Sequence, residues 1–156
     1  MKKAIEIDPA YMEAQNNLGA RYLEHSDYEL AITHLRIASR LDPSSIFART
    51  NLGVALWFAG YCSEAEQTAT DAVRLAPGFL RAQYLMGVIL GAKGSPEALE
   101  HLEKSATEIP QARLLAAGIL LRRGSKTGAS AELRQYLSSG HAQNRAMVEN
   151  WLAEWR

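Results

Sequence analysis

The stretch MEAQNNLGARYLEHSDYELAITHLRIASRLDP, residues 12–43, decides the fold because its landmarks return at a fixed interval along the chain. Its last residue, Pro43, has counterparts at Pro9, Pro77 and Pro110, which gives steps of 34, 34 and 33 residues. Proline has no N–H to donate and disfavours helix at the residue before it, so each of these prolines stops one helix and starts the next. A period of this size is typical of a stacked repeat.

Small residues keep the same register as the prolines. The third unit loses one residue in its turn, and the weaker fourth unit is read with one residue gained. The recurring small residues are Gly19, Gly53, Gly87 and Gly118 in the first helix of each unit and Ala31, Ala65, Ala98 and Ala131 in the second. Glycine inside a helix costs roughly 1 kcal/mol relative to alanine, so we expect these glycines to lie where the two helices of a unit approach closely.

These positions together resemble the tetratricopeptide repeat (TPR) family. The residues that carry the resemblance are Leu18-Gly19-x-x-Tyr22, Asp27-Tyr28-x-x-Ala31, Ala38 and Leu41-Asp42-Pro43. The resemblance covers 12–110 strongly and 111–140 moderately. It implies an all-α fold, a right-handed superhelical solenoid of antiparallel helix pairs. The bulky aromatic residue that the family carries early in the first helix is missing, because Gln15, Arg49 and Gln83 stand there, and we expect polar or aliphatic-stem packing instead.

We expect one domain over residues 1–156. Its parts are the end of a truncated preceding repeat at 1–9, repeats at 12–45, 46–79 and 80–110, a degenerate repeat at 111–140 and a capping helix at 141–156. The expected helices span about 12–25, 28–41, 46–59, 62–75, 80–92, 96–108, 111–123, 127–138 and 142–155. The last helix carries Met147, Val148, Trp151, Leu152 and Trp155 on one face. A solenoid needs its terminal apolar surface covered, which favours a cap, and a partner-binding helix is the alternative.

Composition and charge narrow the class of partner. The chain has 17 basic and 17 acidic residues, so a general affinity for nucleic acid, which needs a basic surface, is not expected. The charge is −3 over residues 1–79 and +3 over residues 80–156. No apolar run, Leu114–Leu121 included, is long enough to cross a membrane. The single cysteine, Cys62, excludes an internal disulfide and leaves the compartment open.

Residues for catalysis or metal binding do not gather into a motif. The four histidines are scattered, none has the spacing of a helical metal pair, and no Cys/His cluster accompanies them. There is no phosphate-binding loop and no nucleophile elbow. We therefore expect no enzymatic activity, no metal and no cofactor.

The resemblance implies that the first helices line a concave groove that holds an extended peptide or a partner helix. The candidate contact residues are Asn16, Phe47, Thr50, Asn51, Val54, Trp57, Arg81, Tyr84, Val88, Leu115, Ile119 and Arg122. The groove is expected to be apolar and aromatic in its middle, acidic at Glu13 and Glu24, and basic at Arg122. The alternative for Trp57, and equally for Phe58 and Tyr84, is packing between neighbouring helices.

Co-chaperone members of the family grip a C-terminal carboxylate with lysine, asparagine and arginine side chains. Asn51 and Arg81 stand at matching places, but Asn16, Ala20 and Leu85 replace other members of that clamp. The clamp is incomplete, and Asn51 is expected to bond to backbone or to neighbouring side chains.

The sequence thus predicts a non-catalytic scaffold that binds a peptide segment or partner helix in its groove. Two alternatives remain. One is a regulatory or targeting fragment of a larger enzyme or assembly factor, and the other is a self-association module that uses the terminal helices.

Overall fold

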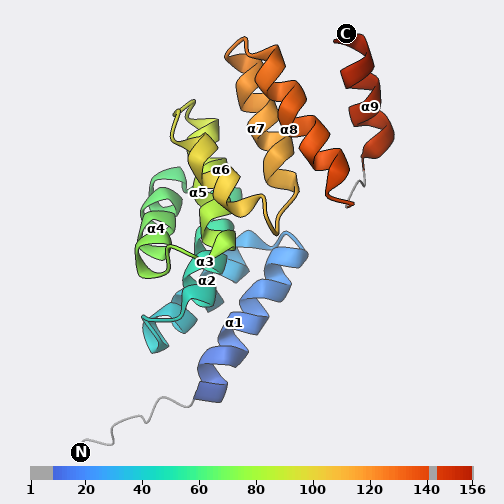
Figure 1. Ribbon diagram of the computed structural model, residues 1–156. Coiled ribbons are helices and arrows are strands. Elements are labelled where there is room, and N and C mark those ends of the chain that lie inside the picture. Colours follow the sequence, from blue (N-terminus) through green and yellow to red (C-terminus); the bar gives the residue numbers. More distant parts are fainter. Residues whose placement is uncertain (1–8, 141–143, 156) are drawn as a thin grey trace, which may run out of the picture. The chain divides into compact units, whose positions relative to one another are not determined.

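The computed structural model describes residues 9–140 and 144–155, and within these ranges it contains nine α-helices and no β-strand (Figure 1). The helices are α1 (Pro9–Glu24), α2 (Tyr28–Leu41), α3 (Ile46–Phe58), α4 (Cys62–Leu75), α5 (Leu80–Ala92), α6 (Ala98–Ser105), α7 (Gln111–Arg122), α8 (Lys126–Ser138) and α9 (Arg145–Glu154). The all-α prediction is confirmed. Of the segment expected to end a preceding repeat, 1–9, residues 1–8 lie outside the described residues, and Pro9 is the first residue of α1. Residues 141–143, at the expected start of the capping helix, also lie outside the described residues.

The observed helix bounds follow the expected ones closely except at the start of α1, which is Pro9 rather than residue 12, and at both ends of α6. This helix was expected over 96–108 but spans only Ala98–Ser105. Turns flank it on both sides. Before it the N–H groups of Ala98 and Leu99 donate to carbonyls three residues back, at Ser95 and Pro96, and after it Glu108 N–H donates to Ser105 O. These tighter bonds replace the outer α-helical turns that were expected.

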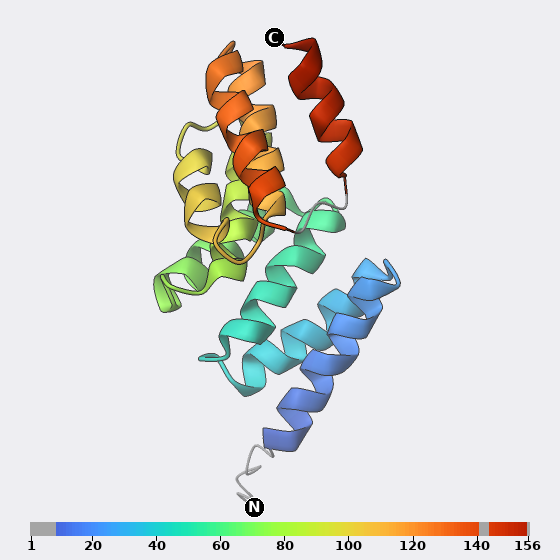
Figure 2. The same cartoon turned by 45° about the vertical axis from the view of Figure 1, so that its right-hand side comes forward.

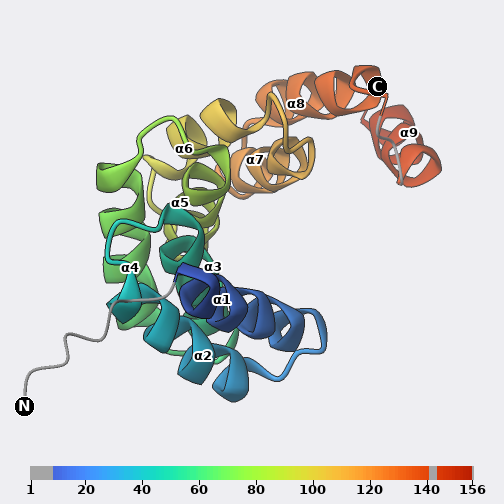
Figure 3. The ribbon, with the colours of Figure 1, turned by 90° about the horizontal axis from the view of Figure 1, so that it is seen from below.

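The chain divides into two compact units between Pro77 and Gly78. Unit 1 holds the hairpins α1/α2 and α3/α4, and in Figure 3 α1 lies beside α2 and α3. Unit 2 holds the hairpins α5/α6 and α7/α8, followed by α9. In Figures 1 and 2, α7 and α8 run side by side and α9 lies next to them.

Each hairpin turns through the same pair of backbone hydrogen bonds. In the first hairpin Ser26 N–H donates to Leu23 O and Asp27 N–H donates to Tyr22 O, at 3.0 and 2.9 Å. This is the Schellman arrangement, which needs one residue with a left-handed backbone. Glycine fills that place in the other three hairpins at Gly60, Gly94 and Gly124, with φ of 86°, 74° and 79°, whereas Ser26 fills it in the first with φ of 64°.

Close approach at glycine is confirmed for the first and third hairpins. A Cβ on Gly19 would lie 2.5 Å from Leu35 Cγ, and one on Gly87 would lie 2.7 Å from Leu102 Cγ. Gly53 is buried. The expectation for Gly118 is wrong, since a Cβ there would meet no atom closer than an Arg122 nitrogen at 3.9 Å.

The fourth hairpin departs from the register expected from its sequence, by one residue in its first helix and by two residues in its second. Ala117 and Ala129 are buried together, whereas Ala131, the expected counterpart of Ala98, is exposed. Ala117 precedes the turn residue Gly124 by seven positions, as Gly87 precedes Gly94. The first helix of the fourth hairpin, α7, therefore has alanine at the place where α1, α3 and α5 have glycine.

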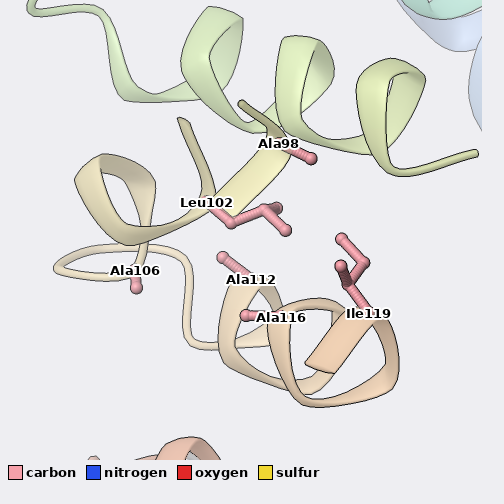
Figure 4. Close-up of a cluster of buried hydrophobic side chains, with 6 residues drawn as sticks. All are labelled: Ala98, Leu102, Ala106, Ala112, Ala116 and Ile119. Carbon is pink, nitrogen blue, oxygen red and sulfur yellow. The ribbon is translucent and has the colours of Figure 1, made fainter. Parts of the chain in front are cut away.

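Small side chains also join the two hairpins of unit 2. Ala98, Leu102 and Ala106 form one buried cluster with Ala112, Ala116 and Ile119 (Figure 4). In Figure 4 the side chain of Leu102 points toward α7. A second cluster joins α7, α8 and α9, with Val148 fully buried and Leu152 and Trp155 packed against it.

Candidate protein-interaction surface

The first helix of each hairpin presents three residues at spacings of seven and four that lie on one face of the helix. We call these residues the open row. Its members are Glu13, Ala20 and Glu24 on α1; Phe47, Val54 and Phe58 on α3; Arg81, Val88 and Ala92 on α5; and Gln111, Gly118 and Arg122 on α7. In every one of these helices the outer two members are exposed and the middle member is partly buried. The open row is therefore the face that helix packing leaves accessible.

A second face of each first helix is used for stacking within a unit. The Asn51 side-chain amide on α3 donates to Asn16 Oδ1 on α1 at 3.1 Å. In unit 2 a Cβ on Gly91 would lie 2.9 Å from Ile119 Cδ1, and Tyr84 packs against the cluster that α6 and α7 share. The expectation that Asn51 bonds to a neighbouring side chain is confirmed.

A third face carries one polar pair to the second helix of the same hairpin. These pairs are Gln15 with His34 at 2.7 Å, Arg49 with Asp71 at 3.9 Å, Gln83 with His101 at 2.6 Å and Arg113 with Glu132 at 3.1 Å. They stand where the family's aromatic residue would be, which confirms the expected polar packing. Gln83 is only 2% exposed, and burial is the main reason why the pKa of the His101 imidazole is lowered.

The candidate residues of unit 1 fall into two groups, those exposed on the open row and those that are buried or bonded to another side chain. Phe47 and Val54 lie on the open row, and Phe47 is 56% exposed. Asn16 and Asn51 are engaged with each other. Thr50 is only 3% exposed and Trp57 is partly buried, so Thr50 offers no surface to a partner.

Phe58 is the residue of unit 1 that the candidate set missed. It is 60% exposed and its ring stacks on Tyr28, with centroids 5.4 Å apart. Its spacing of eleven residues from Phe47 places both rings on the same helix face, which is the signal that could have identified it.

In unit 2, Arg81, Val88 and Arg122 lie on the open row, and Arg122 Nη2 donates to Gly91 O at 3.5 Å. Leu115 is 38% exposed beside the row. Tyr84 belongs to the stacking face, where burial raises the pKa of its phenol. Ile119 is buried in the α6–α7 cluster and is not on the row, because the fourth register begins one residue earlier than expected.

The two units carry opposite charges on their open rows. Unit 1 has the carboxylates of Glu13 and Glu24 and no basic residue, whereas unit 2 has Arg81 and Arg122 and no acidic residue. Within the described ranges none of these four side chains forms an ion pair. Their charges are therefore available to a ligand.

Two pockets lie away from the open row, at equivalent places in the two units. One, of about 330 Å³, lies between α2, α3 and α4, and the other, of about 250 Å³, lies between α6, α7 and α8. Each adjoins the arginine that replaces the aromatic residue, Arg49 or Arg113. Both arginines are already paired with acidic residues, but the pocket of unit 1 is also lined by Ser39 and Arg49, whose Oγ and Nε atoms are buried without a hydrogen-bond partner among the described residues.

Among residues 9–140 and 144–155 no group of three or more His, Cys, Asp or Glu side chains could hold a metal ion. No helix in those ranges is both long enough and apolar enough to span a bilayer.

No described protein family and no curated protein matches the sequence. Solved structures do match the fold. A thermophilic TPR protein of Thermus thermophilus is 19% identical, with a TM-score of 0.76 over 97% of this chain and 84% of that one. PilF of Pseudomonas aeruginosa is 22% identical, with a TM-score of 0.80 over 93% and 67%.

A third match is the first TPR of Spaghetti (RPAP3) bound to the HSP90 peptide SRMEEVD, which is 22% identical with a TM-score of 0.69. It covers 76% of this chain and 99% of that one. Repeated hairpins, glycine-mediated packing and these structural matches agree: the chain has the tetratricopeptide-repeat fold.

Proposed function

We propose that the protein is a non-catalytic interaction module that binds a segment of another polypeptide along the open row of its first helices. The observation that carries this proposal is the exposure of Phe47 and Phe58, which present more than half of their surfaces on one face of α3. Exposed apolar side chains that gather on one face usually mark an interaction site. The structural neighbour that was solved bound to a peptide supports the same class of function.

Apolar burial supplies most of the affinity in this proposal. Burial contributes roughly 25 cal/mol per Å² before association costs are subtracted. Aromatic side chains are the contacts whose truncation usually matters most, which assigns the anchoring role to Phe47 and Phe58. Within unit 1, Val54 extends the apolar surface between the two rings. Within unit 2, Val88 supplies apolar surface, and Arg81 and Arg122 bind carboxylates or backbone carbonyls of a segment held there.

Capture of a free C-terminal carboxylate is not the mode of binding that we propose. The Asn51 amide, which would serve such a clamp, already donates to Asn16. Binding through side chains on the open row needs no rearrangement of this bond.

The test is a comparison of captured partners. The parent protein, the double variant Phe47→Ala/Phe58→Ala and the control Leu75→Ala are used as bait. Leu75 is an exposed apolar residue of α4, on a second helix. The partner should be lost from the double variant and retained by the control, with helix content unchanged by circular dichroism. Equal retention by all three proteins contradicts the proposal.

Self-association is the second candidate function, because apolar side chains are exposed on both terminal helices. They are Tyr11 and Leu18 on α1 and Met147 and Trp151 on α9. Light scattering over a range of concentrations tests this candidate, and a concentration-independent monomer mass excludes it.

A further inference from the structure

We propose that unit 1 selects a basic, apolar polypeptide segment, in which lysine or arginine side chains alternate with hydrophobic ones. This inference rests on the proposed function, since it assigns a chemistry to the ligand of the same surface. It concerns the open rows of α1 and α3 only.

The first step is the register of the two helices. Glu13 and Glu24 occupy the places on α1 that Phe47 and Phe58 occupy on α3. The hydrogen bond between Asn16 and Asn51 fixes α1 beside α3, and Figure 3 shows the two helices as neighbours. Each carboxylate therefore stands at the same level as a phenylalanine ring, and the two levels are roughly 16 Å apart along the helices.

The second step is the chemistry of each level. A carboxylate beside an exposed aromatic ring attracts a cation in two ways, through charge and through the face of the ring. The ring of Phe58 is held by its stacking on Tyr28, whose neighbours Asp27 and Glu29 add negative charge at that end. Glu29 accepts a hydrogen bond from the Tyr61 hydroxyl and is thereby fixed in place.

The third step is that the open row itself holds no competing base, whereas the exposed Arg21 of α1 lies off the row, one turn before Glu24. The open row of unit 1 contains no lysine or arginine, and Arg49 of α3 is turned away to Pro43 O and Asp71. The paired acidic and aromatic levels are therefore complementary to a segment that carries positive charge and apolar side chains together. An acidic segment would be repelled here and suits the open row of unit 2.

The experiment compares two synthetic amphipathic peptides with the same leucine pattern, one completed with lysine and the other with glutamate. Their affinities for the full chain are measured by calorimetry at low and high salt. The lysine peptide should bind more tightly, and added salt should weaken its binding because exposed charge pairs are screened. Glu13→Gln/Glu24→Gln should weaken it roughly fivefold, as expected for two exposed pairs.

The matched control is Glu103→Gln/Glu108→Gln, which removes the same charge at exposed positions of unit 2. It should leave the lysine peptide's affinity unchanged. Phe47→Ala/Phe58→Ala should weaken binding by roughly tenfold or more. All variants are first shown to unfold at the parent urea midpoint.

The outcomes separate this inference from the proposed function. If both peptides bind equally and the phenylalanine variant weakens both, the open row binds segments but the basic preference is overturned. If the glutamine variant keeps the full preference for lysine, or if the lysine peptide does not bind, the inference is likewise overturned. If both peptides bind and the phenylalanine variant changes neither affinity, the proposed function itself fails.

Discussion

At the scale of single residues, one missing side chain sets how closely two helices pack. Gly87 leaves room for Leu102, whose Cγ would lie 2.7 Å from an added Cβ and whose backbone nitrogen would lie 3.2 Å away. Gly118 has the same residue type and a helical position but no such neighbour. The two glycines therefore have opposite expected responses to the same substitution.

Gly87→Ala should destabilise the protein by about 1–3 kcal/mol, because the added methyl overpacks the contact with Leu102. Gly118→Ala should stabilise it by about 1 kcal/mol, because alanine is the better helix former and the space around it is open. Urea unfolding followed by circular dichroism measures both. The same sign for the two variants would falsify the assignment of the tight contact.

His101 gives a prediction about pH. Burial lowers the pKa of its imidazole below the ordinary 6.5, and Lys104 acts in the same direction. The unfolded chain then binds the proton more readily than the folded protein does. The neutral ring's contribution to stability is present above pH 6.5 and is lost as the pH falls through the lowered folded-state value.

The free energy of unfolding should therefore decrease on acidification across this window, and it should decrease less in His101→Gln. Glutamine keeps a donor for the buried Gln83 but has no group that titrates there. Urea midpoints at a series of pH values test this. Identical pH profiles for the parent and the variant would contradict the prediction.

At the scale of the helix and its turn, most helix positions and hairpin pairings could be predicted from the sequence. The 34-residue step of the prolines and glycines specified the hairpins, and the observed helices begin and end near the expected residues. The predicted register of the fourth hairpin was wrong because α7 has Ala117 at the close contact and carries an unrelated glycine, Gly118, one residue later. An alignment of repeats that depends on one residue type, here glycine, shifts out of register where another residue takes its place.

Opposite substitutions at two equivalent turn positions, Ser26 and Gly60, should change stability in opposite directions. Ser26 holds a left-handed backbone that costs a residue with a Cβ about 1–2 kcal/mol, partly offset in glycine by its greater freedom when unfolded. Ser26→Gly should stabilise the protein by roughly 0.5–1 kcal/mol, and Gly60→Ser should destabilise it by a similar amount. Thermal unfolding of the two variants provides the check. A loss of stability in Ser26→Gly would show that its side chain contributes more than its backbone costs.

At the scale of the whole molecule, the proposed binding surface was less predictable than the fold. The two most exposed residues proposed as its anchors are on α3, and only Phe47 was expected to be one of them. The repeat count assigns Thr50 and Ile119 to the groove, but Thr50 is buried and Ile119 is buried against side chains of α6 and close to Gly91 of α5. The partners of the polar pairs, such as Asp71 for Arg49, are also contacts that no local pattern specifies.

The end of unit 2 carries the last prediction. Val148 is fully buried between α9 and the hairpin before it, and burying such a side chain contributes about 1.5–3 kcal/mol. Val148→Glu should release α9 and shift the emission of Trp155 to longer wavelength. Asn150→Glu introduces the same residue at an exposed site and is the control. Unchanged emission and stability in Val148→Glu would show that α9 contributes little to unit 2.

The division of each first helix into faces separates two kinds of evolutionary change. The glycines at close helix contacts, Gly19 and Gly87, and the cross-hairpin polar pairs hold the helices together, and they occupy faces other than the open row. A mutation on the open row can therefore alter the choice of partner while the architecture persists. Duplication of such a hairpin, followed by drift at three positions, is enough to give a new specificity on an unchanged scaffold.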